Sequence, residues 1–142
     1  MRTNLEQSEQ TQTKELFKFF LGGNIPPKKN SKKMVFRGQK RPLLLSSDKY
    51  LSWEKRARYE LLSQIHKPIK PLDLVRIEYL FIFKNRRVKD LSNIIESIND
   101  LLVDCGIIED DKWTILPQME TNARLKNDGE DFGVWVTIKK IT

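Results

Sequence analysis

The sequence predicts an α+β domain in which a small mixed sheet of about four strands supports two main helices. Alternating apolar runs, two stretches of helical periodicity and the turn residues between them follow one another in the order β-α-β-α-β-β. A chain of 142 residues fits one domain with a hydrophobic core. We therefore expect a flexible, polar tail over residues 1–14 and a single domain over residues 15–142.

The first expected strand begins near Leu16 and ends at Gly22-Gly23, because its apolar residues alternate along the chain. The Pro26-Pro27 pair then enforces an extended backbone. Residues 28–41 follow without a single acidic residue, and we interpret them as a loop or a loose hairpin.

A first helix is expected over residues 48–66. Ser46-Ser47 supplies an N-cap, and Asp48 is favourable in the first turn. Pro68 and Pro71 end the helix. Apolar residues recur along it at helical spacing: Tyr50, Trp53, Ala57, Leu61 and Ile65.

The second half of the chain is expected to contain three strands and a helix. Residues 74–83 form the strongest strand pattern, and because both faces are apolar near its end, this strand is expected to be central. Residues 90–104 predict a helix that Gly106 terminates. Trp113 to Leu116 and Phe132 to Ile141 are expected to be the last two strands.

The charge balance favours a nucleic-acid partner. The chain has a formal net charge of +7, and a basic protein attracts polyanions through its summed field. Its single cysteine, Cys105, excludes an internal disulfide and fits a reducing cytoplasm. One His and one Cys are too few for a classical zinc site, so a bound metal would need oxygen ligands, which suit Mg²⁺ or Mn²⁺. The apolar runs are too short to span a membrane.

An acidic run interrupts this basic chain. It contains no Lys or Arg and comprises Asp90, Glu96, Asp100, Asp104, Glu109, Asp110 and Asp111. One interpretation is the solvated face of an amphipathic helix, with Asp90 as its N-cap and with Asn93, Glu96, Ser97, Asp100 and Asp104 opposite the buried stripe. The other is a metal site for phosphodiester cleavage, since a cation allows acids to lie next to phosphate. The missing basic partners and the acids at the helix C-terminus favour the metal site.

These residues resemble the RusA family of Holliday junction resolvases. The resemblance lies in Lys89-Asp90-Leu91-Ser92-Asn93, Asp100-Leu101-Leu102, Gly106 and Asp110-Asp111, and in the earlier Pro26-Pro27-Lys28-Lys29-Asn30. It spans residues 16–141. It implies a homodimeric α+β enzyme, often encoded by phages and prophages, that uses magnesium to cut four-way DNA junctions.

Within the resemblance, Asp90 matches the first aspartate of the family's D-x-D-N motif and Asn93 matches its asparagine. Asp111 matches the downstream metal-binding aspartate. Its neighbour Asp110 is a ligand, a residue that supports a ligand or a general base, and the sequence leaves these roles open.

Two positions depart from the family pattern. Ser92 replaces the second aspartate of the motif, and Glu96 stands where the family has an essential lysine. Either the site has lost activity, or Glu96 supplies the carboxylate that Ser92 lacks. We favour the second interpretation, because the loss and the gain lie one helical turn apart.

Two groups of mostly basic residues that precede the acidic run are expected to contact DNA phosphates. They form an early group and a group next to Asp90: Lys28, Lys29, Asn30, Lys32, Lys33, Arg37 and Arg41, and Arg86, Arg87 and Lys89. The alternative for the early group is a solvated surface loop. Trp113 follows the acid pair and is a candidate for stacking on a base.

The spacing limits how Asp90 and Asp111 can meet. A helix over residues 91–104 is about 21 Å long, and residues 105–111 reach at most about 23 Å. The two aspartates therefore meet only if the chain doubles back nearly straight or the helix starts late; otherwise a dimer partner contributes. The sequence thus supports a magnesium-dependent endonuclease for branched DNA, or a non-catalytic nucleic-acid-binding protein whose acidic helix is an interaction face.

Overall fold

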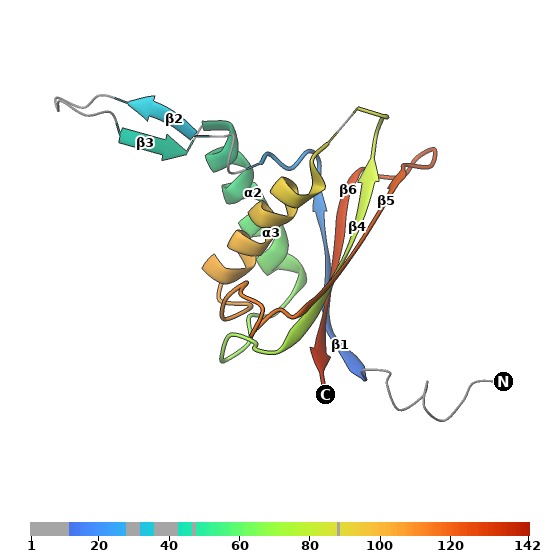
Figure 1. The fold of residues 1–142 in the computed structure, drawn as a ribbon. Coiled ribbons are helices and arrows are strands. Elements are labelled where there is room, and N and C mark those ends of the chain that lie inside the picture. Colours follow the sequence, from blue (N-terminus) through green and yellow to red (C-terminus); the bar gives the residue numbers. More distant parts are fainter. Residues whose placement is uncertain (1–11, 28–31, 36–42, 47, 88) are drawn as a thin grey trace.

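The computed structural model describes residues 12–27, 32–35, 43–46, 48–87 and 89–142. They form a four-stranded mixed sheet with strand order β1-β6-β4-β5 and a separate two-stranded sheet, β2-β3. Helices α2 and α3 pack on the same face of the larger sheet (Figure 1). The predicted α+β class, with its mixed sheet and two main helices, is confirmed. No helix in the described part of the chain is long and apolar enough to cross a membrane.

The central strand of the larger sheet is β4, Val75–Phe83, as predicted. It pairs antiparallel with β6, Gly133–Ile141, and parallel with β5, Gln118–Leu125. The edge strand β1, Thr13–Gly22, pairs antiparallel with β6. A parallel pair needs a crossover between its strands, and α3, Leu91–Asp104, provides it between β4 and β5.

The core lies between the sheet and the two helices. Helix α2, Asp48–Gln64, buries Tyr50, Trp53, Ala57 and Leu61, which are four of the five apolar residues in the predicted stripe. Helix α3 buries an apolar stripe at the predicted spacing, and Ile98 and Leu102 are fully covered. Burial of these two stripes against alternate residues of β4 and β6 therefore fixes both helices to one face.

The free edge of β1 is covered by side chains of α2. Gln64 donates from Nε2 to the carbonyl oxygen of Phe20 at 2.7 Å, and the amide of Phe20 donates to Gln64 Oε1 at 2.8 Å. The amide of Gly22 donates to Glu60 Oε2 at 2.9 Å, and Arg56 donates to the carbonyl of Gly22 at 3.1 Å. We call this end of β1 the covered edge, because the backbone groups of Phe20 and Gly22 have partners within the chain.

A hairpin projects away from the domain (Figure 1). Its strands are β2, Lys32–Val35, and β3, Leu43–Ser46, which pair antiparallel. For these paired residues, the hairpin interpretation of the basic segment is correct. Residues 28–31 and 36–42 lie outside the described residues.

Two boundaries and one strand differ from prediction. The first strand begins at Thr13, so the expected tail over residues 1–14 is too long, and residues 1–11 lie outside the described residues. Helix α2 ends at Gln64 rather than at residue 66. The strand predicted over residues 113–116 is wrong: the amides of Ile115 and Leu116 both donate to the carbonyl of Lys112 in a turn.

The turn buries Ile115 and Leu116, which explains why this segment is apolar without being a strand. The strand that follows, β5, is almost wholly exposed and largely polar, so it shows no apolar alternation. Its place is set by backbone pairing with β4.

We predict that Ile98→Ala lowers the free energy of unfolding by about 2–5 kcal/mol, because it leaves a cavity under α3. Urea unfolding followed by circular dichroism measures the change. Asp104→Ala on the exposed end of the same helix is the control and should stay within about 0.5 kcal/mol of the wild type. Similar losses in both variants would contradict the assigned packing face.

Candidate functional site

The carboxylate of Asp90 is held at the N-terminus of α3. Asp90 is the N-cap, with φ −88° and ψ 101°, and its Oδ1 accepts from the amide of Ser92 at 3.1 Å. The same oxygen accepts from Ser92 Oγ at 2.7 Å, while Oδ2 accepts from Asn93 Nδ2 at 3.1 Å. The motif residues at positions 92 and 93 therefore orient the Asp90 carboxylate.

This arrangement gives a physical role to the serine that replaces the family's second aspartate. The Ser92 hydroxyl donates to Asp90, whereas a second carboxylate there would repel it unless a cation lay between them. Glu96 is exposed one turn further along the helix. Asp90 and Glu96 are therefore the two acidic residues in the N-terminal half of α3, counting its N-cap.

The connection from β4 to α3 exposes Arg86, Arg87 and Lys89 beside Asp90. Of the arginines in the described residues, only Arg86 and Arg87 lie without a carboxylate within ion-pair distance; the others pair with acids, namely Arg56, Arg58, Arg76 and Arg124. Two unpaired guanidinium groups next to a helix N-terminus favour binding of an anion.

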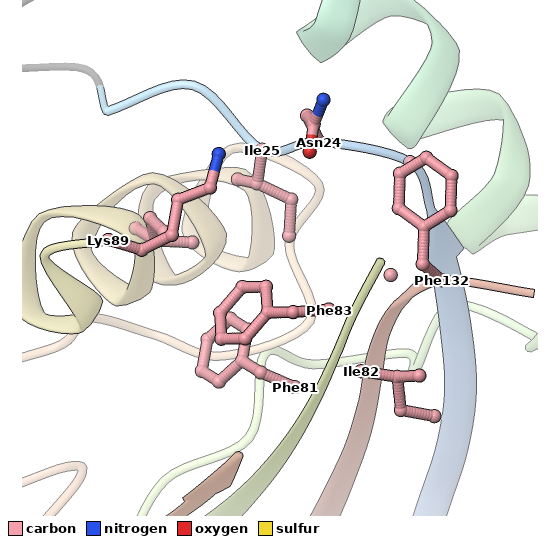
Figure 2. A pocket seen from close by; sticks show the side chains of 10 residues that line it. Asn24, Ile25, Phe81, Ile82, Phe83, Lys89 and Phe132 are labelled. Atoms are coloured by element: carbon pink, nitrogen blue, oxygen red, sulfur yellow. The ribbon is translucent and has the colours of Figure 1, made fainter. Parts of the chain in front are cut away.

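A small pocket opens between this connection and the end of β1 (Figure 2). The stacked rings of Phe81 and Phe83, 5.8 Å apart, form its apolar floor, and Lys89 and Asn24 lie at its rim. An adjoining hollow has a rim of polar and cationic side chains: Asn24, Lys84, Asn85, Arg87 and Lys89. The hollow suits a phosphate group, which accepts hydrogen bonds from amides and cations.

Sequence reasoning missed three residues of this hollow, Asn24, Lys84 and Asn85. Lys84 was visible in the basic run before Asp90, and its Nζ lies 5.1 Å from the ring centre of Phe132. Asn85 accepts at Oδ1 from the amide of Arg87 at 3.0 Å, which shapes the turn. Asn24 carries no sequence signal, because only folding brings the segment after β1 beside residues 84–89.

Asp100, Asp110 and Asp111 lie near one another toward the opposite end of α3. Burial raises the pKa of the Asp111 carboxyl above its usual range, and the hydrogen bond with Asp110 and the charges of Asp100 and Asp110 raise it further. The amide of Asp111 donates to Asp110 Oδ1 at 2.7 Å. Asp111 also raises the pKa of the Tyr79 phenol, after the larger effect of burial. These acids therefore lie close together beneath the C-terminal half of α3.

Within one chain, Asp90 and Asp111 lie far apart along α3. Helix α3 starts directly after Asp90, and its 14 residues span about 21 Å at 1.5 Å per residue. Asp111 lies by Asp100, which is about 15 Å along the helix from Asp90. No three His, Cys, Asp or Glu side chains within the described ranges are arranged to hold a metal ion. Because α3 starts directly after Asp90 and Asp111 lies by Asp100, the two aspartates do not meet within one chain.

The exposed face predicted for α3 needs one correction. Ser97 was expected to face solvent but is fully buried, and its hydroxyl donates to the carbonyl of Pro26 at 2.8 Å. Asn99, which sequence reasoning did not single out, is also buried and accepts from the hydroxyl of Tyr79. Both polar groups position α3, one against the segment after β1 and the other against β4.

Other candidates are distributed over the domain. Cys105 is buried, and burial raises the pKa of its thiol, which does not suit a nucleophile. Trp113 is 78% exposed next to the acid pair. Lys32 and Lys33 belong to β2. The other residues of the early segment that were predicted to contact DNA lie outside the described residues: Lys28, Lys29, Asn30, Arg37 and Arg41.

Comparisons with protein-family models and with curated proteins gave no match to this chain. The resemblance to RusA resolvases therefore depends on the quoted motif residues alone.

We predict that Asp111→Asn stabilises the protein at pH 7. The folded chain raises the pKa of Asp111, so ionisation above the unfolded value of about 3.9 costs stability, and this cost grows as pH rises through the folded pKa. Urea unfolding at pH 3 and pH 7 should show a gain at pH 7 that disappears at pH 3. Asp128→Asn, in the exposed turn after β5, is the control. A variant less stable than the wild type at pH 7 would refute the assignment.

Proposed function

We propose that this protein is a metal-dependent, structure-selective DNA endonuclease that resolves four-way junctions, similar to the RusA resolvases. One observation supports this function most directly. The Asp90 carboxylate is oriented by two motif neighbours and lies beside unpaired cationic side chains. An acid held inside a basic, anion-binding surface is the arrangement that hydrolysis of a phosphodiester next to a cation requires.

The donor set suits magnesium. All candidate ligands are carboxylates, and Mg²⁺ commonly takes one or two carboxylates together with water and substrate phosphate. An ionised carboxylate has about four acceptor sites, so Asp90 can accept these hydrogen bonds and also face a cation. Asp90 and Glu96 would hold the ion at this end of α3, and Mn²⁺ would fit the same oxygen ligands. A bound divalent ion lowers the pKa of water and offsets charge on the phosphate.

We further propose that the active unit is a homodimer in which Asp110 and Asp111 of one subunit complete the site around Asp90 of the other. The length of α3 separates these groups within one chain. In this arrangement Asp111, with its raised pKa, gains from a nearby cation the charge compensation that its own chain does not supply.

The cationic residues have a separate task in this mechanism. Arg86, Arg87 and Lys89 hold the phosphate next to the scissile bond, and the hollow lined by Asn24 and Lys84 accepts a neighbouring phosphate. The projecting β2–β3 hairpin, with Lys32 and Lys33, contacts the DNA backbone further away. Because its substrate would be branched DNA, we propose that the enzyme acts in the cytoplasm.

The direct test is incubation of the purified protein with an end-labelled four-way junction, with and without Mg²⁺ or Mn²⁺. We expect paired incisions near the crossover only when the ion is present, and little incision of a linear duplex of the same sequence. Binding without incision under all conditions would instead support the non-catalytic protein whose acidic helix is an interaction face.

We predict that Asp90→Asn and Asp111→Asn each abolish incision while junction binding is kept or strengthened, because each change removes a negative charge that faces phosphate. Mixing the two inactive variants then tests the shared site. A mixed dimer contains one intact Asp90–Asp111 combination if the site joins two subunits, so incision should return. No recovery in subunit-exchanged mixtures would place each site within one chain.

The Glu96 prediction separates a rebuilt site from a lost one. Glu96→Gln should reduce the incision rate as much as Asp90→Asn does, because it removes the carboxylate that compensates for Ser92. Ser92→Asp combined with Glu96→Lys keeps the carboxylate count and should retain activity. Ser92→Ala removes one hydrogen bond to Asp90 and should cost only a few-fold. Unchanged incision by Glu96→Gln would leave Glu96 as solvated helix surface.

A further inference from the structure

Strand β5 is the open edge of the larger sheet. At the other edge, Arg56, Glu60 and Gln64 cover the backbone groups of β1 at Phe20 and Gly22. In the part of the chain that the structure describes, the backbone of β5 pairs with β4 alone. No helix lies beyond β5 in Figure 1. An eight-residue strand with an unpaired edge is a template for another strand.

Three large apolar side chains are exposed along this otherwise polar edge. Met119 is 54% exposed and Leu125 is 39% exposed, and both lie on the face of β5 that looks toward α3. Trp113, 78% exposed, precedes the strand. Leu125 also lines an open hollow with Phe83 and Arg86. Large apolar side chains exposed along an open strand edge indicate an interaction surface.

The sequence of β5 is complementary to a second, antiparallel copy of itself. In an antiparallel pair, directly opposite residues project from the same face of the sheet. When Asn122 lies opposite Asn122 of a second copy, Glu120 lies opposite Arg124 and Met119 lies opposite Leu125. By symmetry each of these pairs occurs twice. A shift of two residues in either direction breaks both Glu–Arg pairs and both Met–Leu pairs.

We propose that β5 pairs with β5 of a second copy of this chain, antiparallel across a two-fold axis at Asn122. The pairing joins two four-stranded sheets into one continuous sheet. Glu120 and Arg124 already contact Arg76 and Glu130 in their own chain, but their side chains stay 50% and 41% exposed and extend those ion pairs across the interface. The match of charge to charge and apolar residue to apolar residue specifies a second copy as the partner.

This interface uses none of the proposed active-site residues, and it names the surface of the homodimer that the proposed function needs. Antiparallel pairing sets the start of β5 in one subunit against the end of β5 in the other. Asp111 and Trp113 precede the start of β5, and Arg86 and Arg87 follow the end of its neighbour β4. The acidic end of one subunit is thereby directed toward the cationic end of the other.

Charge reversal tests the register. Glu120→Arg and Arg124→Glu each place like charges opposite one another at two symmetric positions, so we expect either variant alone to weaken the dimer roughly tenfold or more. An equimolar mixture of the two variants should form a 1:1 heterodimer, because the two arginines of one strand then face the two glutamates of the other. Sedimentation velocity across a concentration series measures both effects.

The mixing experiment distinguishes an effect on the interface from an effect on folding. Each reversal also breaks an ion pair within its own chain, and mixing does not repair that contact. Glu54→Arg breaks a comparable ion pair with Arg58 on α2 and should leave the dimer unchanged. In addition, Asn122→Cys should form a disulfide-linked dimer on mild oxidation, whereas Lys18→Cys, exposed on the distant strand β1, should not. Cys105 is buried and does not compete.

A monomeric wild type, dimers unaffected by either reversal, or a mixture that fails to associate would each overturn the proposed pairing. Incision assays on the same samples keep the two proposals apart. Normal incision by Glu120→Arg that remains dimeric refutes only this interface, while a wild-type dimer with the expected mixing behaviour and no incision refutes only the nuclease.

Discussion

The crossover from β4 through α3 to β5 determines most of this structure. Ile98 and Leu102 bury the apolar face of α3 against the sheet, and the hydrogen bond between Tyr79 and Asn99 fixes the helix along β4. A helix that returns antiparallel to β4 must start at the strand's carboxyl end and finish at its amino end. Asp90 and Asp111 are therefore held at opposite ends of one rigid element.

The sequence predicted best where burial creates the pattern. Helix α3 and strand β4 face the core, so their apolar periodicity reports their structure directly. Strand β5 was missed because backbone pairing with β4 positions it while its side chains stay in solvent. The buried pair Ile115 and Leu116 attracted the strand prediction instead, although these residues close the end of the core from a turn.

The candidate site shows the same division. That Asp90 begins a helix follows from its N-cap position, and its bonds to Ser92 and Asn93 are local. Ser97 was placed in solvent because a helical wheel treats every polar residue alike, whereas the chain at Pro26 covers this one. The association of Asn24 with the basic turn also depends on tertiary contact, which no local pattern encodes.

The two edges of the sheet differ in how their backbone groups are covered, and this difference bears on how many copies could assemble. Hydrogen bonds from α2 occupy the backbone of β1 at Phe20 and Gly22, so this end of the strand cannot accept a further strand. A sheet with two open sides would add copies indefinitely and grow into a fibre. In the proposed pairing each molecule uses only its β5 edge, and a covered β1 end favours an assembly that stops at two copies. The glutamine, glutamate and arginine side chains of α2 would thus limit strand addition at the edge of the sheet opposite to the proposed pairing.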